Sequence, residues 1–157
     1  MVAESGGNEF QTVYDATSPT ERDRAEIKAL IKTIYERRAA GDIDAVLARL
    51  SPDVVLFLPT TWSYASYPRT VRGRDAVREL FHQRDLNYEA FPSTIHRILV
   101  DGDQAIVHRT CRLRERGGGV DHTHDSVDHF RFRDGLVIEY SKFPDGSARE
   151  FVINFPH

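Results

Sequence analysis

Residues 120–141 read VDHTHDSVDHFRFRDGLVIEYS, two strand-like segments joined by the turn sequence Asp134-Gly135. Alternate residues of a strand share one face, and one face of the first segment carries His122, His124, Ser126, Asp128, Phe130 and Phe132. The two phenylalanines indicate that this face points into the core. A carboxylate on such a face is costly to bury unless it is paired or neutralised, so Asp128 is the first candidate for a functional residue.

The rest of the C-terminal half has the pattern of an antiparallel meander built around this hairpin. Strand-like segments cover about 94–100, 104–116, 120–133 and 136–143, and every connection between them contains glycine. If each connection is a three-residue loop, one cross-strand row contains His96, His108, Asp128 and Tyr140. If Asp134-Gly135 is instead a two-residue turn, Tyr140 moves to the other face and Glu139 or Ser141 replaces it.

The N-terminal half begins with a segment that has no periodicity. Residues 1–17 are therefore predicted to be a disordered tail, followed by a single domain over residues 18–157. The sequence Ser18-Pro19-Thr20-Glu21 predicts a capping box with Ser18 as the N-cap. Behind it, apolar residues recur at helical spacing, which predicts an amphipathic helix that ends at Gly41.

Further helices and one strand complete the N-terminal half. We expect a short helix after Asp42, a buried strand over 54–58 that Pro59 ends, and a helix over about 73–88. Helices gathered in the first half and antiparallel strands in the second half indicate an α+β domain. We expect a strongly curved sheet wrapped around the N-terminal helices, which gives a cone with an internal pocket.

Composition argues against several classes of partner. The chain has 157 residues, 40% of them hydrophobic, which is enough for one sizeable core. A formal net charge of −3 gives no electrostatic reason to expect nucleic acid or an anionic membrane. The chain contains no apolar run of membrane-spanning length, no signal-peptide pattern at its start and one cysteine, Cys111. We therefore expect a soluble cytoplasmic domain.

The cross-strand row suggests acid–base chemistry. A histidine with an orienting carboxylate is a recurring arrangement for proton transfer, so His108 beside Asp128 is the candidate general base. His96 is an alternative base or an acid, and Tyr140 is a candidate donor to a developing oxyanion. The competing interpretation is structural: Asp128 locks the sheet through its partners, and the histidines and Tyr140 are buried core residues.

A second group of residues is predicted to contact a substrate around this row. The same register pairs Arg112 with His124 and Arg114 with His122, a cationic rim that suits an enolate, carboxylate or phenolate. The predicted substrate-binding residues are Trp62, Tyr64, Arg112, His124, Phe130 and Leu58. For the rim the alternative is a solvated strand end, and for the aromatic loop residues it is a plug of the core.

The spacing of His122, His124 and Asp128, followed by Gly135, nearly matches the first metal-binding motif of cupins. A cupin also needs further strands upstream and a later histidine, whereas this upstream half is helical and the corresponding position is Arg149. We therefore expect no metal and no other cofactor.

Several segments together resemble a known superfamily. Ala40-Gly41-Asp42, Leu50–Val55, Gly73–Val77, Val127–Phe132 and Asp134–Val137 are similar in kind and order to segments of the cone-shaped domains of nuclear transport factor 2, ketosteroid isomerase and SnoaL-like polyketide cyclases. The resemblance covers about residues 21–145 and implies their fold. It implies activity much less, because this fold supports many different reactions.

No known catalytic set of that superfamily is present as a whole. The resemblance places Asp128 at the ketosteroid isomerase aspartate that donates to the dienolate oxygen, a neutral carboxylic acid in that enzyme. However, Leu58 stands at the position of its general base and Ile34 at that of its oxyanion tyrosine. Thr94-x-His96 is similar to a catalytic strand of scytalone dehydratase, but Arg38 and Ala39 stand where its tyrosine and aspartate would be. The Asp-Arg-Asp set of limonene epoxide hydrolase is likewise missing.

Two functions of different classes are consistent with the sequence. The first is a cofactor-independent lyase or isomerase that acts on a small cyclic carbonyl compound by His/Asp acid–base chemistry. The second is a non-catalytic binding or dimerisation module. In the second case we expect a homodimer formed by an outward sheet face that carries Val107, Cys111 and Leu113.

Overall fold

A computed structural model describes residues 20–58, 69–119 and 121–145. The elements follow one another as α1 (Glu21–Ala39), α2 (Ile43–Leu47), β1 (Leu50–Phe57), β2 (Thr70–Arg72), α3 (Arg74–Asn87), β3 (Tyr88–Ala90), β4 (Thr94–Asp101), β5 (Gln104–Glu115), β6 (Asp121–Arg133) and β7 (Leu136–Pro144). The predicted α+β class is confirmed. The predicted tail lies outside the described residues, and so do the segments 59–68 and 146–157.

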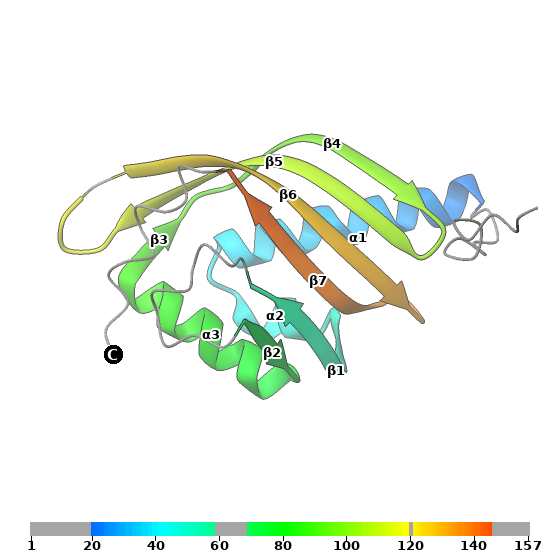
Figure 1. Ribbon diagram of the computed structural model, residues 1–157, viewed down its shortest axis with the longest axis horizontal. Coiled ribbons are helices and arrows are strands. Elements are labelled where there is room, and N and C mark those ends of the chain that lie inside the picture. The colour runs from blue at the N-terminus through cyan, green and yellow to red at the C-terminus, as the bar shows by residue number, and fades with distance from the viewer. Residues whose placement is uncertain (1–19, 59–68, 120, 146–157) are drawn as a thin grey trace, which may run out of the picture.

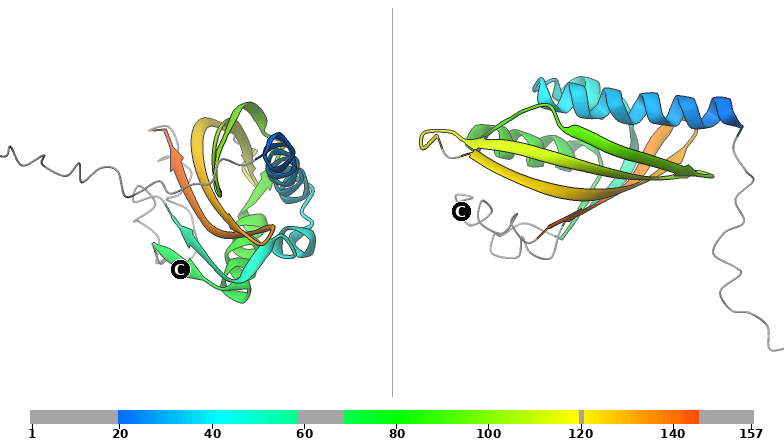
Figure 2. Two further views of the ribbon diagram at one scale, coloured as in Figure 1. Left: turned by 90° about the vertical axis from the view of Figure 1, so that its right-hand side faces the viewer. Right: turned by 90° about the horizontal axis from the view of Figure 1, so that it is seen from above.

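All the described strands belong to one sheet, in the order β2-β1-β7-β6-β5-β3, with β4 also paired to β5. The pairings are antiparallel except that of β1 with β7, which is parallel. The sheet is strongly curved, and the helices gather on its concave side (Figures 1 and 2). This arrangement is the cone that the sequence predicts.

Helix α1 supplies the wall of the cone that faces the long strands. Its first turn is closed by a capping box in which the Thr20 hydroxyl accepts from the Asp23 amide and the Asp23 carboxylate accepts from the Thr20 amide. The prediction that Ser18 is the N-cap is therefore wrong. The helix starts at Glu21, and Thr20 is the residue with extended backbone directly before it. Ile31, Ile34 and Tyr35 are buried, as the predicted apolar stripe requires.

The core fills the space between α1, α2 and the inner sheet face. Its members include Ile31, Val46, Val54, Val107 and Phe130, each at most 2% exposed. Burying such side chains is the dominant favourable contribution to folding, at about 1.5–3 kcal/mol for each. No helix among the described residues is both long enough and apolar enough to cross a membrane.

The register between β5 and β6 differs by one residue from the prediction. Val107 lies opposite Asp128, and His108 lies opposite Val127. The loop around Gly117-Gly118-Gly119 encloses an even number of residues, because Arg114 pairs with Asp121. A shift of one residue moves every side chain of β5 to the other face.

This shift reverses the predicted dimer face. Val107 and Cys111 are buried on the inner side, and Leu113 lines the cavity described below. The prediction that these residues form an outward dimerisation surface is therefore wrong. A homodimer itself remains a prediction.

The turn between β6 and β7 is a two-residue turn, with φ of 53° at Asp134 and 75° at Gly135. Positive φ at both central residues is typical of a type I′ turn. A bulge opposite Arg131 and Phe132 then adds one residue to β7. This extra residue reverses again which side chains of β7 face inward. Tyr140 therefore faces inward despite the two-residue turn, and neither Glu139 nor Ser141 takes its place.

We predict that Gly135→Ala lowers the free energy of unfolding by about 1–2 kcal/mol, because a Cβ atom is unfavourable in the left-handed region. Gly118→Ala is the matched control, since Gly118 also lies in a hairpin loop but has no positive φ, and a Cβ there would make only ordinary contacts with the Glu115 side chain. Urea denaturation of both variants tests this prediction. Equal stabilities would contradict the type I′ assignment.

Candidate active site

A cavity of about 150 Å³ lies between α1, α3 and the inner face of the sheet. Most of its lining is apolar, with Ile34, Leu56, Leu80, Phe81, Phe130 and Val137 among the contributors. An apolar cavity of similar volume in another protein is known to bind benzene, so this space suits a single ring. Among the described residues, the polar side chains that line it are more often cationic than neutral: Tyr35, Arg38, Arg84, Tyr88, Ser93, Arg109, Arg112, Tyr140 and Lys142.

Asp128 anchors a polar cluster directly behind one wall of this cavity. Its carboxylate is completely buried. Oδ2 accepts hydrogen bonds from the Tyr35 hydroxyl at 2.7 Å, from Arg109 Nε at 2.7 Å and from the Tyr140 hydroxyl at 2.9 Å. Oδ1 accepts from the Ser126 hydroxyl at 2.6 Å. The donors come from α1, β5, β6 and β7, so one carboxylate connects the helix to three strands.

These contacts determine the charge state of the cluster. Burial raises the pKa of Asp128, but Arg109, Lys142 and the hydrogen bonds from Ser126 and Tyr35 together hold that pKa below its ordinary value. Burial alone would lower the pKa of Arg109. The neighbouring Asp128 carboxylate has the larger opposite effect, so the pKa of Arg109 is raised above its ordinary value. Asp128 and Arg109 therefore form a buried ion pair at neutral pH. Asp128 is not a neutral acid of the ketosteroid isomerase kind.

The two tyrosines are neutral donors on the cavity side of Asp128. Burial, followed by the Asp128 charge, raises the pKa of both Tyr35 and Tyr140 well above the usual value. Phe130 contacts both rings edge-on, with centroid distances of 6.0 Å to Tyr35 and 4.9 Å to Tyr140. Because each hydroxyl donates its proton to Asp128, its oxygen remains able to accept a hydrogen bond from a ligand.

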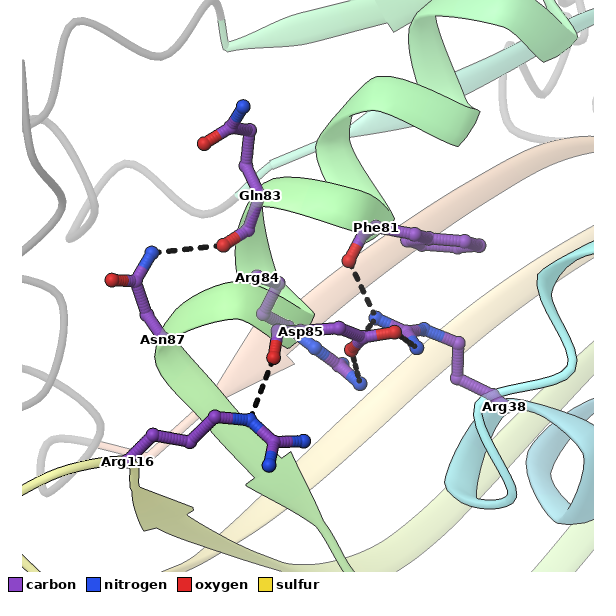
Figure 3. A network of polar contacts seen from close by, with 7 residues as sticks. All are labelled: Arg38, Phe81, Gln83, Arg84, Asp85, Asn87 and Arg116. Atoms are coloured by element: carbon purple, nitrogen blue, oxygen red, sulfur yellow. Dashed lines mark hydrogen bonds and ion pairs between the residues drawn. The ribbon is translucent and has the colours of Figure 1, made fainter.

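A second ion pair lies where α1 meets α3 (Figure 3). Arg38 donates two hydrogen bonds of 2.8 Å to the Asp85 carboxylate, and its guanidinium lies 4.2 Å from the centroid of the Phe81 ring. Arg84 approaches the same carboxylate less closely, at 3.5 Å. Its Nε and Nη2 atoms are buried without a hydrogen-bond partner among the described residues. Burial, and then the charge of Arg38, lowers the pKa of Arg84 to about 9.

Lys142 lies opposite Asp128 in the β6–β7 ladder and lines the cavity. Burial, and then the charge of Arg109, lowers its pKa to about 8. Its ammonium is 3.8 Å from the Cys111 thiol. An amine that titrates this close to neutral pH is able to accept a proton, which an arginine cannot do.

The predicted catalytic row is only partly present. Tyr140 shares a face with Asp128 and donates a hydrogen bond to it, but it is not its ladder partner as predicted, because Tyr140 lies opposite Phe130 and Lys142 lies opposite Asp128. His108 and His96 do not meet Asp128, because the β5 register places His108 on the outer face of the sheet, where both imidazoles are exposed. The prediction that Asp128 orients a His108 base is therefore wrong, and His96 is not an alternative base at this cavity.

The predicted substrate-binding residues divide into three groups. Leu58, Phe130 and Arg112 line the cavity, although the Arg112 guanidinium also pairs with Asp121 at 2.7 Å. His124 faces inward and is buried, but it does not line the cavity, and burial lowers its pKa to about 4. Trp62 and Tyr64 lie outside the described residues.

The predicted rim pairs are also absent, because Arg112 lies opposite Thr123 and Arg114 lies opposite Asp121. Both arginines instead form ion pairs with the Asp121 carboxylate. The near match to a cupin motif gives no site either, since both Asp128 oxygens already accept hydrogen bonds from side chains.

Sequence reasoning missed three residues of the site: Tyr35, Arg109 and Arg84. Tyr35 lies on the apolar stripe of α1, one residue from Ile34, which stands at the position of the ketosteroid isomerase tyrosine. For Arg109 the available signal was the alternation of Ala105, Val107, Cys111 and Leu113, which indicates an inward face that includes residue 109. For Arg84 the available signal was helical spacing, because Val77, Leu80, Phe81 and residue 84 recur at i, i+3, i+4 and i+7 and therefore share one face of α3.

Comparison with known proteins supports the fold and the family. The family model of the SnoaL-like domain matches residues 31–140. An NTF2-like protein of unknown function from Burkholderia pseudomallei is 22% identical and superimposes with a TM-score of 0.73, covering 82% of this chain and 98% of the other. No curated protein matches this chain significantly in sequence.

Two further structures of similar fold carry names that indicate ligands or reactions. An LEH-like epoxide hydrolase of M. tuberculosis is 21% identical, with a TM-score of 0.64 and coverage of 77% of this chain and 84% of the other. TerC, co-crystallised with polyporic acid, is 22% identical, with a TM-score of 0.68 and coverage of 82% and 97%. At these identities the likeness establishes the fold alone.

We predict that Asp128→Asn lowers the free energy of unfolding by about 3–5 kcal/mol, because it leaves the Arg109 charge buried without its partner. The matched control is Asp121→Asn, which also removes a carboxylate paired with arginine, but at the solvent-exposed end of the sheet. That control should leave the urea midpoint nearly unchanged. Similar midpoints for both variants would show that the Arg109–Asp128 pair does not stabilise the fold.

Proposed function

Because the chain belongs to the SnoaL-like domain family, we propose that it is a cofactor-independent isomerase or lyase that acts on a small cyclic carbonyl compound bearing an acidic group. The observation that carries this proposal is a half-buried lysine, Lys142, that lines an apolar cavity whose other charged lining residues, within the part of the chain that the structure describes, are all arginines. A neutral amine in such a place is a general base, and the arginines favour the negative charge that proton removal creates.

The charge balance of the cavity supports an anionic ligand. Asp128 compensates Arg109 and Asp85 compensates Arg38, but neither carboxylate lines the cavity. Arg84 and Lys142 add positive charge beyond that of these two ion pairs. Their cationic neighbours contribute to the lowered pKa of both groups. A carboxylate or enolate in the cavity would reduce this repulsion, so we expect ligand binding to raise both pKa values.

The proposed reaction is a proton transfer within the bound compound. Neutral Lys142 removes a proton from the carbon next to the carbonyl group, and the electron pair moves onto the carbonyl oxygen. Arg84 stabilises the enolate oxygen through Nε, which has no hydrogen-bond partner among the described residues, whereas its Nη2 lies 3.5 Å from Asp85 Oδ1. If the compound has a β,γ double bond, the lysine returns the proton to the γ carbon of the dienolate as the carbonyl re-forms, which moves the double bond and gives isomerisation. If it has a β-hydroxyl group, the lysine protonates that group as the carbonyl re-forms and the C–O bond breaks, which releases water and gives dehydration.

Tyr35 and Tyr140 position the ligand rather than react with it. Their raised pKa values keep them protonated, and their protons are directed to Asp128. A ligand hydroxyl group is therefore the complementary partner, because it can donate to either tyrosine oxygen. The structure of TerC with polyporic acid supports the choice of an acidic ligand for this fold.

The direct test follows exchange of the carbon-bound protons of 4-oxocyclohexanecarboxylate with D₂O by NMR. This probe combines one ring, a ketone and a carboxylate. We expect exchange above the buffer rate, and a loss of about 100-fold or more in Lys142→Arg, which keeps the positive charge but removes the base. Lys142→Met should lose exchange and also weaken binding of the probe about 10-fold, because it removes the charge as well.

Several outcomes would reject parts of this proposal. Exchange that is unchanged in Lys142→Arg would exclude Lys142 as the base. Binding of the probe without any exchange would instead support the non-catalytic binding module. Equal binding of the probe and of uncharged 4-oxocyclohexanecarboxamide would exclude recognition of the acidic group.

The pH dependence provides an independent prediction. The base is active only when unprotonated, and the lowered pKa of Lys142 lies near 8, so the exchange rate in the free enzyme should rise with pH through a midpoint near 8 before it levels off. Because a bound anion favours the ammonium form, the midpoint in the complex should lie above 8. A profile that falls with pH, or one that Lys142→Arg leaves unchanged, would contradict the assignment.

A further inference from the structure

A cluster of two histidines and one aspartate lies on the outer face of the sheet, away from the cavity. His96, His108 and Asp125 come from the neighbouring strands β4, β5 and β6, and all three side chains are exposed. Their rings and carboxylate are in close contact: the two imidazole centroids are 4.8 Å apart, and His108 Nε2 lies 3.6 Å from Asp125 Oδ2. None of these groups belongs to the proposed reaction.

Two features of the sheet bring these residues together: a bulge in β4 and the pairing of β5 with β6. β4 has a register shift between Ile95 and Arg97, so His96 is the extra residue and lies on the same face as His108. On the other side of β5, Thr110 lies directly opposite Asp125, two residues along the strand from His108. Bulges often re-aim a side chain at functional sites, and this one directs an imidazole toward a second imidazole.

We propose that His96, His108 and Asp125 bind a divalent transition-metal cation that accepts imidazole and carboxylate ligands, with Zn²⁺ as its representative. One ligand atom from each residue lies within 4.8 Å of the other two. Tetrahedral zinc with bonds of about 2.0–2.2 Å needs ligand atoms about 3.4 Å apart, so modest side-chain rotations would close the site. Two imidazoles and one carboxylate are a recognised ligand set that leaves a further position for water.

The surroundings of the cluster favour a cation. The Thr110 hydroxyl donates to Asp125 Oδ1 at 2.6 Å and contacts His96 Nε2 at 2.7 Å, so it orients a carboxylate and an imidazole at once. Such neighbours of the ligands fix their geometry and increase metal affinity. The Asp145 carboxylate accepts from the Asp125 amide at 3.1 Å and adds negative charge nearby.

The electrostatics of Asp125 agree with this assignment. The hydrogen bond from Thr110 is the main cause of a lowered pKa at Asp125, and His108 and His96 lower that pKa further. The carboxylate is therefore ionised at neutral pH, which metal binding requires. Two adjacent imidazoles bind a metal in their neutral form. Metal binding therefore avoids the repulsion between two neighbouring imidazolium ions.

The test is titration of tag-free, chelator-treated protein with ZnCl₂ by calorimetry, and with CoCl₂ by visible absorption. We expect one zinc per chain and the absorption bands of cobalt with nitrogen and oxygen ligands. His96→Asn, His108→Asn and Asp125→Asn should each weaken zinc binding at least 10-fold. The matched control is His129→Asn, which removes an imidazole from the outer face of β6 that contacts Gln104 instead.

The same protein supplies a test that needs no variant. Nitrogen-15 NMR of the histidine side chains should show zinc-dependent shifts of His96 and His108 but not of His129. No binding at one equivalent, binding that the three substitutions leave unchanged, or shifts confined to other histidines would overturn the proposal. Half an equivalent of zinc per chain, accompanied by dimer formation, would also overturn it, because the site would then be incomplete within one chain.

Discussion

The buried ion pair between Arg109 and Asp128 is the interaction on which the inner side of this protein depends. Removing two charges from water costs several kcal/mol per ion, and the cost is offset only when the remaining hydrogen-bonding capacity is satisfied. Asp128 meets this condition by accepting from Tyr35, Ser126 and Tyr140 as well. Because these donors come from different elements, docking of α1 onto the sheet and formation of the polar cluster are one event.

This requirement also explains why the cavity is positively charged. Asp128 does not reach the cavity surface and its two oxygens already accept hydrogen bonds, so its negative charge offsets only part of the repulsion between Lys142 and the neighbouring arginines. Both cations are therefore held in apolar surroundings with lowered pKa values. Such an arrangement costs stability in the empty protein, and sites that bind or convert ligands commonly show this kind of cost. An anion that fills the cavity would recover part of it.

The sequence predicts the fold far better than the arrangement of the site. Helical spacing in residues 21–39 and alternation in residues 121–133 are local patterns, and they correctly identify α1, β6 and the inward position of Asp128. Strand register is not local, because one residue more or less in a loop reverses every side chain. The loop after β5 was misread by one residue, and this alone replaced Arg109 by His108 in the predicted site. Only the face of Tyr140 is as predicted, because the two-residue turn and the bulge together shift β7 by two residues, so that Tyr140 lies opposite Phe130 and not opposite Asp128.

The same register gives β5 two separate functions. Arg109 and Cys111 point to the polar cluster and the cavity, while His108 and Thr110, which alternate with them along the strand, point outward to His96 and Asp125. Alternation keeps the two sites on opposite faces of one strand, so no side chain of β5 can contribute to both sites. It also makes them mechanically dependent, because a change of register in β5 would exchange their side chains and destroy both. The Arg109–Asp128 ion pair opposes such a change, since sliding β5 by one residue would bury His108 and leave Asp128 without its cation. The interaction that stabilises the inner site therefore also fixes the geometry of the outer one.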